Sequence, residues 1–218
     1  MKKNLLILVM LLPLVTFSGC SKNDEEKLKL DKSEISLYYE ETEKITANKS
    51  DLQWSSENEF IAEVDNEGLV IGGHVGETYI TARSEWGEAR CKVEIKAKYN
   101  LFDDLIIEFG KSRAYIKSQE KRVLISDDEK ELIYKLSSSS SDHVVYFFGT
   151  SGLEASTVII KLPNPLTENI TNYLLERFQF IDSNDEKTYF SFNKNSIYIG
   201  YSVYADGVSI KYTKYTGR

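Results

Sequence analysis

"EARCKVEIKA", residues 88–97, alternates between two kinds of side chain, and this alternation decides the fold of the first part of the chain. The odd positions carry Ala, Cys, Val, Ile and Ala, whereas positions 90, 92, 94 and 96 are charged. A period of two is typical of a strand with one buried and one solvated face, as in antiparallel sheets. Cys91 falls on the apolar face, which predicts a small buried side chain rather than a nucleophile.

Similar short runs precede this strand at regular intervals. They are "EISLYY", "EKITA", "LQWSS", "IAEVD", "GLVIG" and "ETYITARSE", which together span residues 34–85. Turn-forming residues separate them at 48–51, 66–68 and 72–73. Several short strands with such spacing predict a β-sandwich.

The same region resembles the bacterial immunoglobulin-like domain of group 2. The matching positions are Trp54, Ser55, Ser56, Ile61, Ala62, Val64, Asp65, Gly68, Val70, Gly76, Ile80 and Ala82. The resemblance implies an all-β Ig-like sandwich over residues 28–98, acting as a spacer or adhesive module outside the cytoplasm rather than as a catalyst. One departure is Tyr39-Glu40-Glu41-Thr42, where the family usually has a glycine before the threonine.

Trp86 occupies the tip of an expected hairpin, in "SEWGEA". Two interpretations remain open for it. An exposed indole could stack on a sugar ring or bind a partner. Alternatively, the ring folds back onto the end of the sheet, since single exposed apolar residues are common.

The N-terminus has the features of an export signal. A basic start is followed by the apolar run from Leu5 to Phe17, whose 13 residues would reach only about 20 Å as a helix, short of the roughly 30 Å of a bilayer core. Phe17-Ser18-Gly19-Cys20 resembles the lipobox of bacterial lipoproteins. We therefore expect a signal peptide at 1–19 and a diacylglycerol on Cys20, which would make the membrane a partner. An ordinary secretory signal with an incidental cysteine is the alternative.

Residues 20–27 form an expected tether with a cluster of charges, namely Lys22, Asp24, Glu25 and Glu26. The cluster is similar to the signal that sends some Gram-negative lipoproteins to the outer face of the outer membrane. It is equally consistent with a solvated spacer in a protein that faces the periplasm. We expect a lipid-anchored outer-membrane protein exposed at the cell surface, with the periplasmic face as the alternative.

The charge balance limits the partners of the chain. The 218 residues carry a formal charge of −7, and removal of Lys2 and Lys3 with residues 1–19 leaves 25 basic and 34 acidic side chains. An acidic surface of this kind repels nucleic acid, which we exclude as a partner. The expected partners are the membrane and either a glycan or another envelope protein.

Residues 99–218 predict a second domain, of α+β class. Helices are expected in "KSRAYIKSQE" (111–120) and in "LTENITNYLLERF" (166–178), with Ser112 and Thr167 as N-caps. Each precedes alternating strands, which suggests two helix-plus-antiparallel-sheet units. This order is similar to the beta-lactamase inhibitor protein and to small outer-membrane assembly lipoproteins. The stretch "FGKSRAYIKSQEKRVL" (109–124) also resembles the opening of C-terminal domains of uncharacterised envelope lipoproteins that carry the same Ig-like module, and that resemblance implies no activity.

The last hairpin carries the predicted binding surface. If Ile199 and Tyr201 turn inward, Tyr198 and Tyr204 must point the other way, and Tyr215 can join them from the partner strand. Exposed tyrosines are enriched where proteins contact partners. If the helices covered this face instead, the tyrosines would belong to the core.

Few residues are suited to catalysis. The two histidines, His74 and His143, have no local motif partner, no His/Cys cluster has zinc spacing, and no cofactor motif is present. We therefore expect a non-catalytic, lipid-anchored envelope protein in which an Ig-like spacer presents a C-terminal binding or adhesion domain. The alternatives are a cell-surface glycan hydrolase with converging carboxylates and a periplasmic structural or assembly lipoprotein.

Overall fold

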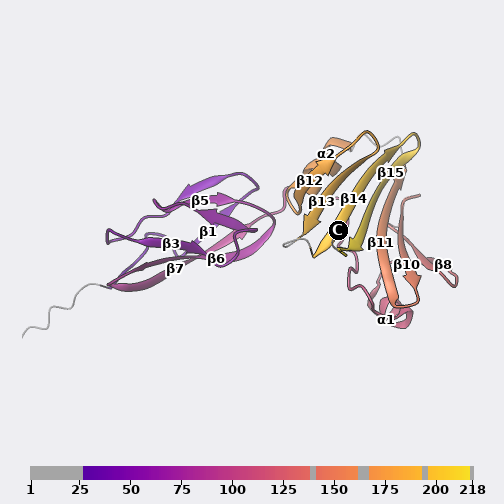
Figure 1. The fold of residues 1–218 in the computed structure, drawn as a ribbon, viewed down its shortest axis with the longest axis horizontal. Helices are drawn as coiled ribbons and strands as arrows, with labels where there is room; N and C mark the ends of the chain where they lie inside the picture. The colour runs from indigo at the N-terminus through magenta and orange to yellow at the C-terminus, as the bar shows by residue number, and fades with distance from the viewer. Residues whose placement is uncertain (1–26, 138–140, 162–166, 193–195, 217–218) are drawn as a thin grey trace, which may run out of the picture.

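The computed structural model describes residues 27–137, 141–161, 167–192 and 196–216. Within these ranges the protein is mostly β, with a four-stranded, a three-stranded and an eight-stranded sheet. Figure 1 shows the two smaller sheets at one end of an elongated molecule and the large sheet at the other. We call the first part the N-terminal sandwich and the second the C-terminal sheet.

The N-terminal sandwich contains seven strands. They are β1 (Glu34–Leu37), β2 (Thr42–Lys44), β3 (Gln53–Ser56), β4 (Ala62–Val64), β5 (Leu69–Gly72), β6 (Gly76–Ser84) and β7 (Gly87–Ile95). One sheet has the order β1-β7-β6-β3 and the other β2-β5-β4. Cys91, Val93 and Ile95 of β7 are buried between them, as their alternation predicts. The chain enters the four-stranded sheet through β1, which pairs with β7 in parallel.

Local geometry explains two positions in the sandwich. Gly68 has a φ of 80°, and a Cβ there would lie 2.5 Å from the carbonyl oxygen of Ile45 and 2.7 Å from the ring of Trp54, so only glycine fits. Glu40 has a φ of 63° in the turn before β2, at the site where the sequence lacks the usual glycine. The chain thus makes this turn with a residue that disfavours it.

The C-terminal sheet contains the remaining strands. They are β8 (Leu124–Asp127), β9 (Glu131–Lys135), β10 (His143–Gly149), β11 (Gly152–Lys161), β12 (Gln179–Ser183), β13 (Lys187–Phe192), β14 (Ile197–Tyr204) and β15 (Gly207–Lys214). Helix α1 (Arg113–Gln119) precedes β8, and helix α2 (Thr167–Leu175) precedes β12. Ser112 caps α1 as expected, because its hydroxyl accepts a bond from the Tyr115 amide.

The prediction of an α+β domain with two helix-and-sheet units is wrong. The helices are short, seven and nine residues, and the strands form one sheet in the order β12-β13-β14-β15-β11-β10-β9-β8. Strands β8–β11 and β12–β15 belong to one sheet because β11 pairs with β15, which places Val158 opposite Ile210. Strand β11 carries the apolar run Val158-Ile159-Ile160, and an unpaired edge would leave its backbone groups without partners.

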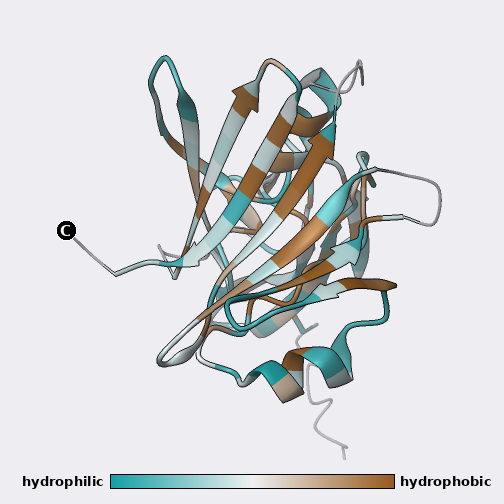
Figure 2. Cartoon of the chain, turned by 90° about the vertical axis from the view of Figure 1, so that its right-hand side faces the viewer, coloured by the Kyte–Doolittle hydropathy of each residue, from teal (hydrophilic) through white to brown (hydrophobic). Residues whose placement is uncertain are grey.

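One face of the C-terminal sheet is covered. Ile170, Tyr173 and Leu174 of α2 pack on Ile199, Tyr201 and Ile210, and Ile116 of α1 packs near Leu132 and Tyr146. The segment 99–109 crosses the same face, where the Ser156 hydroxyl donates to the Ile106 carbonyl at 2.6 Å. In the part of the chain that is described, no helix packs on the opposite face, which we call the open face; Figure 2 views the sheet from the end away from the sandwich.

The two parts meet at a joint between the loop before β6 and the end of α2. The Val75 amide donates to the Glu176 carbonyl at 2.7 Å, and Nδ1–H of His74 donates to the Leu175 carbonyl at 3.1 Å. The Phe60 ring packs on His74 and on Phe192 of β13, at centroid distances of 4.1 and 5.6 Å. Neither described helix is long and apolar enough to span a bilayer.

Candidate functional site on the open face

The open face can be assigned residue by residue from the strand register. Ile199 and Tyr201 are buried against α2, so Tyr198 and Gly200 project from the other side of β14. The structure thus places the helices away from the tyrosine face. Val203, at the hairpin end of the strand, is exposed.

A single row of side chains crosses the centre of this face. Direct cross-strand partners run from β10 to β13 in the order Val145, Thr157, Lys211, Gly200 and Tyr189. With about 4.8 Å between neighbouring strands, the row spans about 19 Å. It therefore brings together residues that lie far apart in the sequence.

Gly200 makes a notch in this row. A Cβ built on it would meet no atom within 4 Å, so the space above the strand is open. Tyr189 and Lys211 flank it on the neighbouring strands, and Tyr198 precedes it by two residues on the same face. The notch has a backbone floor and two aromatic walls.

The two tyrosines lie against each other. Their ring centroids are 5.1 Å apart with planes inclined by 31°. Partial burial raises the pKa of Tyr198, and the neighbouring Tyr189, Asp182 and Tyr215 add to the effect. The Tyr198 phenol therefore stays neutral and can donate a hydrogen bond at physiological pH.

Lys211 and Thr157 line the other side of the notch. The Lys211 ammonium lies 5.9 Å from the ring centroid of Phe147, two strands away, so its side chain reaches across β11. Thr157 beneath it is only 4% exposed, and its hydroxyl has no hydrogen-bond partner among the described residues. A buried hydroxyl in this state is unusual and costly.

The open face differs in charge from the rest of the protein. Along its cross-strand rows the charged side chains are Lys135, Lys161, Lys187 and Lys211 against Glu131 and Asp182. The whole chain, by contrast, has a net charge of −7. The face is thus a locally basic region on an acidic protein.

The residues singled out in the sequence do not form one site. Tyr198 lines the notch, and Tyr215, 40% exposed, lies just beyond β15 and close to it. Tyr204, 55% exposed, lies six residues further along β14, about 20 Å away. Tyr189 and Thr157 were missed, although the alternation in "KTYFSF" and "STVIIK" could have identified them.

Trp86 lies at the far end of the sandwich. Its ring is half-buried, with the Lys49 ammonium 4.3 Å from its centroid, and its carbonyl accepts a hydrogen bond from the Leu28 amide at 3.4 Å. Nine residues of β7 separate it from the joint, which is about 30 Å. Cys20, Lys22, Asp24, Glu25 and Glu26 lie outside the described residues.

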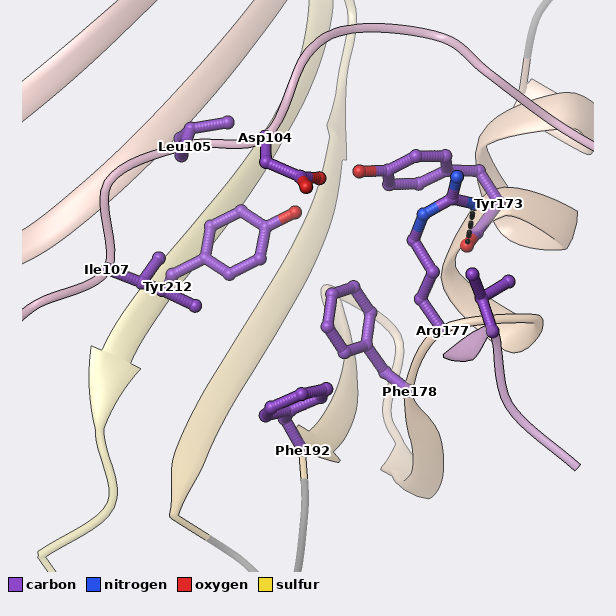
Figure 3. A pocket seen from close by; sticks show the side chains of 9 residues that line it. Asp104, Leu105, Ile107, Tyr173, Arg177, Phe178, Phe192 and Tyr212 are labelled. Atoms are coloured by element: carbon purple, nitrogen blue, oxygen red, sulfur yellow. Dashed lines mark hydrogen bonds between the residues drawn. The ribbon is translucent and has the colours of Figure 1, made fainter. Parts of the chain in front are cut away.

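A cavity of about 360 Å³ lies at the joint (Figure 3). Val75 of the sandwich closes one side, and Tyr173, Arg177 and Tyr212 belong to the C-terminal part. Burial raises the pKa of Tyr173 to about 12, and its hydroxyl is hydrogen-bonded to that of Tyr212. These polar groups satisfy one another, so we assign the cavity to the packing of the joint.

The carboxylates relevant to a hydrolase lie elsewhere. Asp103, Asp104 and Asp142 line a more open cavity of about 600 Å³ together with Arg177. The first two are exposed, and the third accepts a bond from the Lys161 amide. In the described ranges, no three His, Cys, Asp or Glu side chains gather as a metal site would require. Nothing in this arrangement favours glycoside hydrolysis.

Comparison with known proteins identifies the class of the sandwich. Residues 39–94 match the bacterial Ig-like domain (group 2), so this part of the chain is such a domain. No match was found among curated proteins.

Two solved structures of a surface-layer protein align with the chain. "Structure of the S-layer protein SbsC, domains 5-6" is 13% identical, with 87% of this chain and 83% of that chain covered and a TM-score of 0.28. "Structure of surface layer protein SbsC, domains 4-9" is 15% identical, with 88% and 27% covered and a TM-score of 0.29. At such low TM-scores the likeness supports no functional inference.

Proposed function

We propose that this chain is a non-catalytic, lipid-anchored protein of the outer membrane, in which the Ig-like sandwich is a spacer that presents the open face of the C-terminal sheet for binding. Cys20 carries the lipid in this proposal, and the acids after it direct the protein to the cell surface. The C-terminal sheet supplies the adhesive surface.

The observation that best supports this proposal is the path of the chain through the sandwich. Leu28, where the tether ends, is bonded to Trp86 at one end of β7, and the chain leaves at Ile95 at the other end. An anchor and a binding surface are thereby held about 30 Å further apart. The bonded joint at His74 and Val75 would keep the surface in a fixed orientation.

Lipid labelling tests the anchor. Cells grown with a clickable fatty acid should label the wild-type protein, and Cys20→Ala should abolish the label. Cys91→Ala is the matched control, because Cys91 is buried in the sandwich and should not be acylated. Labelling that persists in Cys20→Ala would contradict the proposal.

Protease added to intact cells tests surface exposure. The wild-type protein should be degraded, and replacement of Asp24, Glu25 and Glu26 by alanine should protect it. Protection of the wild-type protein, with degradation only after the outer membrane is opened, would instead support a periplasmic structural role.

A further inference from the structure

We propose that the notch over Gly200 binds a carbohydrate that carries carboxylate groups. This inference rests on the proposed function, since it names the ligand of the presented face. The notch would hold one sugar ring, and the row of residues beside it would hold the neighbouring ring.

The shape of the notch fits a sugar ring. The missing side chain at Gly200 leaves a gap one residue wide between Tyr189 and Lys211, open to solvent. Tyr189 and Tyr198 offer flat apolar surface with a hydroxyl at the rim. The C–H groups of a sugar can pack on such rings while its hydroxyls bond to the phenols.

The charge of the notch selects an acidic sugar. Lys211 directly borders Gly200, and its ammonium has only the distant face of the Phe147 ring as a partner among the described contacts. A carboxylate in the notch would offer a stronger, charge-assisted bond. Lys135 and Lys187 add positive charge along the outer rows of the same face.

Thr157 provides an independent indication of a ligand. Its hydroxyl is buried beside Lys211 without a hydrogen-bond partner. When Lys211 moves toward a carboxylate over Gly200, this hydroxyl becomes accessible to a sugar hydroxyl. The distance from Tyr189 to Thr157 is three strand spacings, about 14 Å, which is room for more than one ring.

The composition of the row favours a sugar over a protein. Protein interfaces depend on large apolar side chains buried in desolvated pockets. The row has instead a glycine, a threonine and a lysine between one tyrosine and one valine. Such a row offers a shallow surface for stacking and groups for hydrogen bonding, which suits a sugar better than a protein.

Calorimetry on the full-length protein in detergent tests the inference. The probes are a hyaluronan hexasaccharide, which carries a carboxylate on every second sugar, and the neutral chitin hexasaccharide. The acidic probe should bind at least about tenfold more tightly, the factor expected from one charge-assisted bond. Equal affinity for both would overturn the assignment of an acidic ligand, and no binding of either at millimolar concentration would overturn the site.

Two variants locate the binding. Gly200→Val fills the notch, and because valine favours strands the melting temperature should not fall, while affinity should drop about tenfold or more. Lys211→Met should weaken binding similarly, whereas Lys214→Met, on the same strand but the opposite face, should not. Wild-type affinity in Gly200→Val would overturn the proposal. The proposal would also be overturned if the protein bound no carbohydrate but captured an envelope protein, and if Gly200→Val blocked that capture.

The outcome is separable from that of the proposed function. Gly200→Val should keep wild-type fatty-acid labelling and protease sensitivity on cells. Failure of the calorimetry therefore leaves the anchor intact, and failure of the labelling leaves the carbohydrate site intact.

Discussion

His74 joins the two parts of the molecule through a ring that is largely removed from water. It lies between Phe60 and Tyr39, at centroid distances of 4.1 and 5.9 Å, and donates to the Leu175 carbonyl. Burial lowers the pKa of this imidazole, and the hydrogen bond to Leu175 opposes that shift only in part. The joint therefore holds His74 in its neutral form.

This environment predicts that acid weakens the protein through His74. The unfolded chain binds a proton near pH 6.5, and the folded chain does so only at lower pH. The free energy of unfolding should thus be constant above pH 6.5 and fall as the pH drops from there to the lower folded pKa. In His74→Phe, which lacks the proton and the hydrogen bond, stability at pH 8 should be about 1 kcal/mol lower.

Thermal unfolding between pH 5 and 8 measures the effect. The gap between the wild-type protein and His74→Phe should narrow toward acid, because only the wild type loses stability through this group. A constant gap would contradict the prediction.

At the scale of elements, the end of α2 depends on Glu176. This residue is 2% exposed, and its carboxylate accepts bonds from the amides of Lys98 and Tyr99, at 2.9 and 3.0 Å, and from the Arg177 guanidinium. The carboxylate thus fixes the start of segment 99–109 against the helix. Glu120 and Arg122 form a similar buried pair after α1.

Removal of this carboxylate should be severe. Glu176→Ala leaves two amides and a guanidinium without their partner, and we expect a loss of about 3 kcal/mol in the free energy of unfolding. Glu168→Ala, at an exposed position in the first turn of the same helix, should cost less than about 1 kcal/mol. Urea denaturation of both variants measures the difference. Similar losses in the free energy of unfolding would show that Glu176 does not fix segment 99–109 against α2.

Local patterns predicted most elements but not their limits or their pairing. The spacing of Ile170, Leu174 and Phe178 predicted a helix to 178; the helix ends at Leu175, yet Phe178 still reaches the same core through a bond from its amide to the Leu174 carbonyl. Strand β12 was missed because all five of its residues are exposed and a bulge interrupts its register. The β11–β15 pair joins segments about fifty residues apart, which periodicity cannot specify.

At the scale of the whole molecule, the connection between the two parts should resist protease. Lys96 and Lys98 are exposed trypsin sites, but the Lys96 amide bonds to the Leu37 carbonyl and Tyr99, Leu101 and Phe102 pack on the core of the C-terminal part. We expect slow cleavage there. The double variant Phe60→Ala/His74→Ala, which loosens the joint, should be cut faster.

Mass spectrometry of timed digests identifies the cut. Fragments ending at Lys96 or Lys98 would agree with the predicted division into domains 28–98 and 99–218. Tyr204→Ala, on the distant hairpin, should digest like the wild type. If the wild-type protein is cut first after Lys98, the joint is not rigid.

The open face could be predicted only in part, because a face belongs to the whole sheet. Alternation along one strand indicated Tyr198, but the proximity of Tyr189 and Thr157 depends on the register of four strands. Gly200 forms a notch only because these neighbours flank it, so the sequence of its own strand does not reveal the notch.

If the chain is anchored at one end and binds at the other, as proposed, the parallel pairing of β1 with β7 has a mechanical consequence. A pull between the two ends of the sandwich would draw Glu34 one way and Ile95 the other, along the strand axes. The load would then act in shear on all the hydrogen bonds between β1 and β7 at once, from the bond of the Lys92 amide to Ser33 to that of the Lys96 amide to Leu37. It would not open them one after another. A cell held by this protein under flow would be pulling on the sandwich in its strongest direction.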